Sequence, residues 1–281
     1  MKRLLFWGVI AAVAGSLSFG AISILRKPMP PYKSVAQKKL AVPFPREILG
    51  QSPRLSGKDL VAMNLWKQKV YGLAREYKGR IFLNGDTTNK NVCLTFDDGP
   101  DQVVTPQVIN TLKSYNVKGS FFFIGKRVER YPKVVLGAYT NGDLVLNHSF
   151  THPRLDLTSP LQVKQELTNT EQAIFNVIGR RPLLMRPPYG GIDAQVVEDV
   201  YDQGCKAVLW SMDTLDWTGK TPEEITQSVL ANVRPGDIIL FHTNENRIAT
   251  AQALPGIITG LQERGYKILD LAQMLNTDAY K

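Results

Sequence analysis

The sequence predicts an α/β fold built on parallel strands, as a barrel or a doubly wound sheet. From Asn91 onward, short apolar segments alternate with longer helical stretches, and this alternation is typical of parallel pairing with crossover connections. Helix-start signals precede the helical stretches, as at Asp193 and at Thr221–Glu224. Polar and turn residues follow the apolar segments directly, which marks strand ends. The 281 residues can bury one large core.

The first element along the chain is an apolar segment, and residues 1–26 are interpreted as a signal anchor or a signal peptide. Leu4 to Leu25 carries no charge and has 22 residues, enough to span a bilayer as a helix. We expect an uncleaved membrane anchor with the body exported to the periplasm or the exterior. Small residues at Ala14–Ser16 leave cleavage and secretion as the alternative.

A proline-rich linker and a helix follow. Residues 27–57 contain six prolines, up to Pro53, and are expected to be extended without regular structure. Residues 58–90 form a lead-in, in which Lys58–Lys78 has apolar positions at helical spacing, including Leu60, Val61, Leu65 and Val70. We expect one helix that packs these positions against the following domain, residues 91–276.

The strands of that domain are recognised by their apolar or β-branched runs. The seven predicted strands are Val92–Phe96, Ser120–Ile124, Asp143–Asn147, Leu183–Arg186, Lys206–Ser211, Asp237–Phe241 and Tyr266–Leu269.

The net charge of +9 does not indicate a nucleic-acid-binding protein. Residues 1–46 hold eight basic residues and no acid, which leaves 34 − 8 = 26 basic residues against 25 acids in the rest. The body is therefore nearly neutral, and no basic face is predicted. The two cysteines, Cys93 and Cys205, lie in or beside apolar segments and are expected to be buried free thiols.

Two adjacent carboxylates end the first strand of the domain. Asp97 and Asp98 follow the run from Val92 and precede Gly99-Pro100, which turns the chain out of the strand. Neighbouring like charges are unfavourable unless a cation offsets them, so one aspartate is expected to bind metal while the other acts as a base. A plain Asp-Asp-Gly turn is the alternative.

All three histidines follow predicted strands, at the edge where parallel strands place active sites. His148 and His152 come after the third strand, and His242 comes after the sixth. Two imidazoles with Asp98 would form an open metal site suited to catalysis. Two unrelated surface histidines are the alternative.

Other strand ends carry an arginine and two tryptophans. Arg186 precedes two prolines that stiffen its loop, and its guanidinium is expected to hold Asp97 ionised and oriented. Trp210 and Trp217 are interpreted as walls of a groove for sugar rings, although core packing is the ordinary use of tryptophan.

From Asn91 to Leu275, the chain resembles the polysaccharide deacetylases of carbohydrate esterase family four. Five motifs of that family are present in order: Thr95–Pro100, His148–His152, Arg186–Gly190, Asp213–Trp217 and Leu240–His242. The resemblance implies a distorted (β/α)7 barrel and a hydrolase that releases acetate from an N-acetylated polysaccharide, with peptidoglycan first and chitin-like polymers second.

The resemblance also implies the roles of the site residues. Asp98, His148 and His152 would bind a divalent metal, usually zinc, with Asp97 as general base and His242 as general acid. Arg186 would tune Asp97, and Asp216, favoured by its spacing over Asp213, would tune His242. The Tyr189 amide would hold the oxyanion, and Leu240 would line the pocket for the acetyl methyl group.

One departure from the family pattern concerns the last motif. Many members have an aspartate directly after the last histidine, whereas here Thr243-Asn244-Glu245 follows His242. The departure leaves the groove and the substrate open. An O-acetyl esterase on the same scaffold is one alternative, and a catalytically silent glycan-binding protein, disfavoured by the complete catalytic set, is another.

Overall fold

The strands of this protein form one parallel sheet that curves into an open barrel. A computed structural model describes residues 44–281, so the predicted apolar segment Leu4–Leu25 and the linker up to residue 43 lie outside the described part. In the described part, no helix combines the length and the apolar character needed to cross a bilayer. The strands are β1 (Ile81–Phe82), β2 (Asn91–Asp97), β3 (Ser120–Phe123), β4 (Leu144–Asn147), β5 (Leu184–Met185), β6 (Lys206–Val208), β7 (Met212–Asp213), β8 (Ile238–His242) and β9 (Lys267–Leu269).

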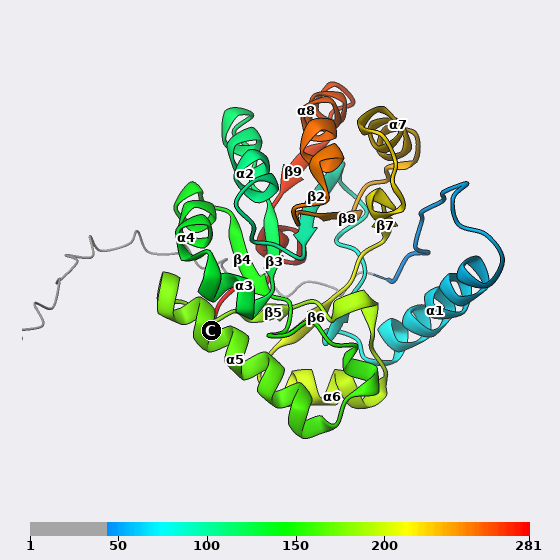
Figure 1. Cartoon of the computed structure of the whole chain (residues 1–281). Coiled ribbons are helices and arrows are strands. Elements are labelled where there is room, and N and C mark those ends of the chain that lie inside the picture. Colours follow the sequence, from blue (N-terminus) through cyan, green and yellow to red (C-terminus); the bar gives the residue numbers. More distant parts are fainter. Residues whose placement is uncertain (1–43) are drawn as a thin grey trace, which may run out of the picture. The chain divides into compact units, whose positions relative to one another are not determined.

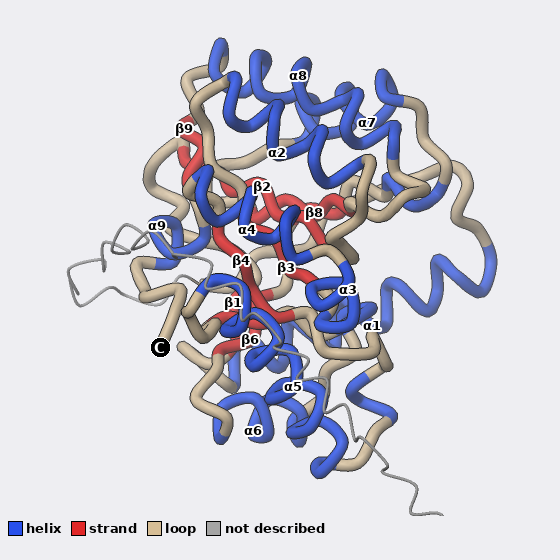
Figure 2. Tube along the Cα trace, turned by 60° about the vertical axis from the view of Figure 1, so that its left-hand side comes forward, coloured by secondary structure: helices blue, strands red, loops and turns tan. Residues whose placement is uncertain are grey.

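Helices surround these strands (Figure 1). In Figure 2, α2, α7 and α8 lie on one side of the strands, and α5 and α6 lie on the opposite side. The helices are α1 (Gly57–Glu76), α2 (Val104–Ser114), α3 (Gly125–Arg130), α4 (Pro132–Asn141), α5 (Pro160–Ile178), α6 (Ala194–Asp202), α7 (Pro222–Asn232), α8 (Ile248–Glu263) and α9 (Leu271–Leu275). Short 3-10 turns are η1 (Leu155–Leu157), η2 (Pro188–Gly190) and η3 (Asp216–Thr218).

The sheet order explains why the strand ends converge. The order is β1-β6-β5-β4-β3-β2-β8-β7, with β9 also paired to β2, and every pairing between these strands is parallel. All C-terminal ends therefore point to the same edge. Because β1 and β7 end the order, the barrel is open between them, in agreement with the distorted barrel that the family resemblance implies.

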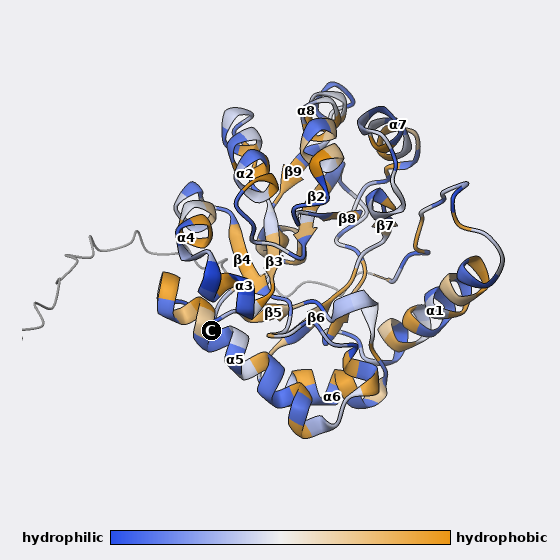
Figure 3. Ribbon diagram, in the orientation of Figure 1, coloured by the Kyte–Doolittle hydropathy of each residue, from blue (hydrophilic) through white to orange (hydrophobic). Residues whose placement is uncertain are grey.

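The core consists of the strands and the apolar faces of the helices. Phe96 on β2 stacks on Phe121 and on Phe241, with ring centroids 4.9 and 5.5 Å apart. The residues of the longer strands are almost all buried, as expected for a parallel sheet covered by helices. In Figure 3, the strands are mostly hydrophobic, whereas hydrophobic and hydrophilic residues alternate along the helices.

The predicted helix starts are confirmed by their caps. Asp193 accepts a hydrogen bond from the Val196 N–H, and Thr221 accepts one from the Glu224 N–H in a capping box. Both contacts satisfy N–H groups that a helix leaves without partners in its first turn.

The seven predicted strands are present, but the predicted strand Lys206–Ser211 is wrong in its second half. It ends at Val208, and a separate strand, β7, begins at Met212. Arg186 Nε donates a hydrogen bond to the Val208 carbonyl at 3.0 Å, and Arg186 Nη2 donates one to the Leu209 carbonyl at 2.9 Å. Since these carbonyls bond a side chain, they are not free to extend the ladder in the usual way.

The helix expected over Lys58–Lys78 is found as α1, but its packing differs from the expectation. Val70 and Ala74 are buried, whereas Leu60, Val61 and Leu65 are 43%, 60% and 62% exposed. The apolar side chains of Leu60, Val61 and Leu65 therefore do not pack against the domain, and the prediction was wrong for these three residues.

The segment before α1 is not a free spacer. Ile48 is buried, and Leu49 pairs with Met212 of β7. The expected boundary at residue 91 also falls inside the sheet, because β1 pairs with β6. Residues 44–90 are thus part of the same folded body. The two cysteines are free and buried, as predicted.

Candidate active site

Asp97 and His242 lie opposite each other at the C-terminal edge of the sheet, on the paired strands β2 and β8. Asp98 follows β2, Leu240 lies on β8, and the other predicted site residues lie at or after the ends of β4, β5, β6 and β7 at the same edge. The sheet thus gathers residues that are far apart along the chain, as expected for parallel strands.

Asp97 is held by a buried arginine. Arg186 Nη1 donates to Asp97 Oδ1 at 2.7 Å and to Thr95 Oγ1 at 2.9 Å, and the guanidinium is fully buried. Burial lowers the pKa of Arg186, and the charge of Asp97 opposes this shift. An arginine stays protonated under such conditions, so Asp97 has a permanent cationic partner. The predicted pairing of these two residues is confirmed.

Asp98, His148 and His152 converge on one point. Asp98 Oδ1 lies 3.0 Å from His152 Nε2 and 3.5 Å from His148 Nε2, and the three ligand atoms lie within 4.8 Å of one another. Asp98 and His152 have φ values of 69° and 65°, in the left-handed region, so tight turns aim both side chains inward. Burial alone would raise the pKa of Asp98, but the two nearby imidazoles and His242 hold it well below its usual range.

This trio has the donor chemistry of a divalent metal site. His148 Nδ1 lies 2.8 Å from the Arg186 carbonyl oxygen, which can accept only from an N–H, so Nε2 faces the trio with its lone pair. A carbonyl that fixes the tautomer of a histidine in this way is typical around metal ligands. Two imidazole nitrogens and one carboxylate oxygen suit zinc and leave room for water. The residues present therefore fit the ion that the sequence predicts.

His242 is paired with Asp216 and not with Asp213. Asp216 Oδ1 lies 2.7 Å from His242 Nδ1, while Oδ2 accepts from the His242 amide at 2.9 Å and from Thr250 Oγ1 at 2.6 Å. Burial disfavours the charged imidazole, but Asp216, followed by Asp98 and Asp97, outweighs burial and raises the pKa of His242 to about 10. Asp213 instead accepts from the Leu215 amide, and burial raises its pKa to about 6.

The predicted substrate-binding residues differ in exposure. Tyr189 is 65% exposed and its ring lies 4.6 Å from that of His152, while Trp217 is 41% exposed. Leu240 is buried on the strand that ends at His242. Trp210 is only 6% exposed, because Trp66 of α1 stacks on it with ring centroids 5.0 Å apart. The prediction that Trp210 forms a groove wall was therefore wrong, and the ring that covers it is Trp66.

The residues that depart from the family pattern in the last motif contact both aspartates. Thr243 is buried, and its amide donates to the Asp97 carbonyl at 2.9 Å while its own carbonyl accepts from Thr105 Oγ1. Asn244 Nδ2 donates to Asp98 Oδ2 at 3.1 Å. These two residues thus support both aspartates, a role that sequence analysis missed.

Glu166 of α5 is another supporting residue that sequence analysis missed. Its Oε2 accepts from the amides of Phe150 and Thr151, both at 2.7 Å, and its Oε1 accepts from Thr151 Oγ1 at 2.6 Å. One carboxylate thereby fixes the loop between His148 and His152. Glu166 lies on a helix outside the five motifs, so no local signal marked it.

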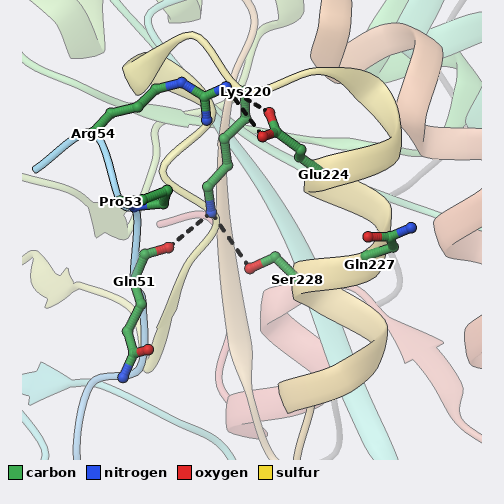
Figure 4. A pocket seen from close by; sticks show the side chains of 7 residues that line it. All are labelled: Gln51, Pro53, Arg54, Lys220, Glu224, Gln227 and Ser228. Carbon is green, nitrogen blue, oxygen red and sulfur yellow. Dashed lines mark hydrogen bonds and ion pairs between the residues drawn. The ribbon is translucent and has the colours of Figure 1, made fainter.

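A separate pocket is lined by the segment before α1, by Lys220 and by α7 (Figure 4). Its two cations already have partners, because Arg54 pairs with Glu224 and Lys220 Nζ donates to the carbonyls of Gln51 and Thr214. The predicted catalytic residues do not line it, so the strand-end cluster is the candidate active site.

Comparisons with known proteins agree with this geometry. Residues 84–208 match the family model described as polysaccharide deacetylase. Over 196 residues, the chain is 34% identical to a peptidoglycan-N-acetylglucosamine deacetylase of Bacillus cereus, a match that covers 69% of this chain and 71% of that protein. Over 187 residues, it is 38% identical to the peptidoglycan-N-acetylglucosamine deacetylase PgdA of Listeria monocytogenes, covering 66% of this chain and 39% of that longer protein.

The structural comparison gives the same result. The crystal structure of the Bc1960 peptidoglycan N-acetylglucosamine deacetylase superposes with a TM-score of 0.72 at 32% identity, over 74% of this chain and 98% of that one. The match covers nearly all of the Bc1960 chain.

Proposed function

The chain belongs to the polysaccharide deacetylase family, and from this membership we propose that it is a metal-dependent hydrolase that removes N-acetyl groups from a cell-envelope or extracellular glycan and releases acetate. The observation that carries the proposal is the meeting of three units at one edge of the barrel: Asp97 with Arg186, Asp98 with His148 and His152, and His242 with Asp216. Amide hydrolysis needs a base, an electrophilic centre and an acid, and each unit supplies one of them.

Asp98, His148 and His152 would hold the metal, for which we propose zinc. When bound, the cation supplies a Lewis acid that acidifies water and polarises a carbonyl. The proposal is supported by the donor set and by the tautomer that the Arg186 carbonyl imposes on His148.

The side chains of this site then divide the proton transfers between them. Asp97 takes a proton from the attacking water, since Arg186 holds its Oδ1 and its Oδ2 lies 3.7 Å from His148 Nε2, beside the metal ligands. His242 donates a proton to the departing amine, which is otherwise a poor leaving group. Asp216 keeps His242 charged and correctly oriented.

Binding of the acetyl group and the sugar would involve residues around this centre. The Tyr189 amide would donate to the oxyanion, and Leu240 would contact the acetyl methyl group. The exposed ring of Trp217 offers an apolar face to a sugar ring.

Peptidoglycan is the first substrate we propose, because the matched relatives from Bacillus cereus and Listeria monocytogenes are named for it. Chitin-like polymers come second. The match covers 39% of the length of the Listeria relative. The activity, substrate and partners of this chain are therefore proposals that rest on the residues of its own site.

The test is acetate release by the purified protein from peptidoglycan, chitin oligomers and O-acetylated xylan. Asp97→Asn should keep the fold and the metal, because the asparagine oxygen can still accept from Arg186, yet turnover should fall about 10²-fold or more. Asp98→Ala, His148→Ala and His152→Ala should each lose metal and activity together. No acetate from any glycan would refute the proposal, and a metal-free Asp97→Asn would mean that the duties of the two aspartates are exchanged.

The alternative of an O-acetyl esterase is tested with His242→Ala. An amine must be protonated to leave, whereas an alkoxide needs that help less, so this variant should lose amide hydrolysis more severely than ester hydrolysis. Equal losses on both substrates would leave His242 without its acid role.

A further inference from the structure

Helix α1 reaches the active-site loop through the side chain of Trp66. Trp66 Nε1 donates to the Gly190 carbonyl oxygen at 2.7 Å, across 124 positions of sequence. A Cβ atom at position 190 would lie 2.5 Å from Cζ2 of Trp66, and Gly190 has a φ of 61°. The indole thus fits directly against the backbone that follows Tyr189.

The same indole covers a ring beside Arg186. Trp66 stacks on Trp210 with an interplanar angle of 27°, and the Trp210 ring lies 5.6 Å from the Arg186 guanidinium carbon. Trp210 Nε1 is buried and has no hydrogen-bond partner in the described residues. Since no hydrogen bond of its indole fixes Trp210, its position depends on packing, to which Trp66 contributes directly.

Tyr189 needs support from outside its own loop. Its φ of 58° is unusual for a residue with a side chain and costs free energy unless the surroundings impose it. Its side chain is 65% exposed, so its own packing restrains it little. The hydrogen bond from Trp66 to the next residue supplies a restraint that does not depend on substrate.

We propose that Trp66 is a positioning residue for the reaction, which holds the Tyr189 amide through Gly190 and the Arg186–Asp97 pair through Trp210. The inference rests on the proposed function. Trp66 lies outside the residues that match the family model, 84–208. Through Trp66, α1 would contribute to the active site.

The experiment compares Trp66→Ala, Trp66→Phe and Val70→Ala with the wild type. Each protein is assayed for kcat and KM of acetate release, for affinity toward Zn²⁺ after metal removal, and for its melting temperature. Val70 is a fully buried residue of the same helix, so Val70→Ala loosens the docking of α1 while it leaves the contacts of Trp66 in place.

Trp66→Ala should lower kcat about 10- to 100-fold, because small displacements of positioned groups are costly in rate. Its KM and Zn²⁺ affinity should stay near the wild-type values, because Trp66 touches no metal ligand in the contacts described above. Trp66→Phe keeps an aromatic ring on Trp210 but lacks the N–H donor, so its kcat should be intermediate. Val70→Ala should melt at a lower temperature and keep the wild-type kcat.

Two results would overturn this inference and leave the proposed function standing. One is a wild-type kcat in both Trp66 variants, and the other is a loss of kcat in Val70→Ala as large as in Trp66→Ala. The second would mean that Trp66 acts only by docking the helix. Absence of acetate release by the wild type would overturn the proposed function and, with it, this inference.

Discussion

Asp97 and Asp98 are adjacent, yet they have different partners. Asp97 is the last residue of β2 and faces Arg186, whereas Asp98 has left the strand at a φ of 69° and faces the two imidazoles. The change of backbone direction between them separates the two carboxylates. It allows one to be neutralised by an arginine and the other to bind a cation.

Asp216→Asn tests whether Asp216 controls the proton on His242. The pKa of His242 is raised above its ordinary value, so the protonated imidazole persists below that pKa, about 10, and is lost as pH rises through it. A bound cation at Asp98 would offset the effect of the Asp98 charge on His242. In the metal-loaded enzyme, the pKa of His242, and with it the alkaline limb of the pH profile of kcat/KM, should therefore lie below this value. Removing the charge of Asp216 should move the alkaline limb of kcat/KM down by roughly 1–3 pH units, measured as a pH profile.

Asp213→Asn is the matched control, because Asp213 belongs to the same motif and is buried but does not bond His242. Asparagine can still accept from the Leu215 amide, so the alkaline limb should move far less. An unchanged limb in Asp216→Asn would contradict the acid role of His242, and equal shifts in both variants would contradict the choice of Asp216.

Asn244→Ala should weaken metal binding about 10- to 100-fold, because groups that orient a metal ligand typically contribute this much. The Asn244 amide donates to Asp98 Oδ2 and leaves Oδ1 toward the histidines. The measurement is a Zn²⁺ titration of the metal-free protein.

Asn246→Ala is the control for Asn244. Asn246 is exposed and contributes only its backbone amide to the Asn244 side chain. Metal affinity that is unchanged in both variants would show that Asp98 needs no support from Asn244.

Residues whose role shows in the neighbouring sequence were predictable, whereas residues whose role depends on contacts far along the chain were not. That Asp97, His242 and the trio Asp98, His148 and His152 meet at one edge was predictable, because each lies at or soon after the end of an apolar run and the carboxyl ends of parallel strands converge. Asn244 and Trp66 were not, because their contacts with Asp98 and Gly190 span 146 and 124 positions. An asparagine in a loop and a tryptophan on a helix have many ordinary uses, so nothing local distinguishes these two.

At the scale of elements, α5 supports the candidate metal site from outside the barrel. Glu166→Ala removes three hydrogen bonds from the loop between His148 and His152, in which Ser149 and His152 both have positive φ. Backbone conformations of this kind persist only when the surroundings hold them. We expect Zn²⁺ affinity to fall about tenfold or more in a titration.

Glu171→Ala on the same helix is the matched control. Glu171 pairs with Arg181 and Lys281 and does not touch the loop, so its loss should affect stability and spare metal affinity. Equal metal affinity in Glu166→Ala and in the wild type would mean that the loop is held by its other contacts.

The elements themselves were largely predictable, with exceptions that have physical reasons. Long apolar runs and helix caps have strong local signals. Strands β1, β5 and β7 have two residues each, too few to show any periodicity, and of these only β5 was predicted. The break after β6 depends on Arg186, which lies outside that strand. The exposed apolar positions Leu60, Val61 and Leu65 of α1 were mistaken for a packed face because apolar periodicity does not reveal whether a partner is present.

At the scale of the whole molecule, the basic excess belongs to the N-terminal arm, and the remainder of the chain is almost neutral. A near-neutral body suits an enzyme that acts on a polymer and not a nucleic-acid-binding protein. We propose that the arm holds the enzyme at a membrane, where a cell-envelope glycan is within reach.

Deleting residues 1–43 should release the protein from the membrane fraction without loss of acetate release, because the described body from residue 44 onward contains the whole candidate site. In the sequence, the apolar run Leu4–Leu25 is long enough to span a bilayer, and it precedes a proline-rich stretch that reaches Pro43. The measurement is fractionation of cells that express the full chain or the deletion, with N-terminal sequencing of each product. Full-length expression that yields only a soluble extracellular protein, with a new N-terminus beyond Gly15, would refute an uncleaved anchor and favour a cleaved signal. A deletion variant that folds but stays with the membrane would instead mean that the body carries its own attachment, and the exposed Leu60, Val61 and Leu65 of α1 would be the first residues to replace.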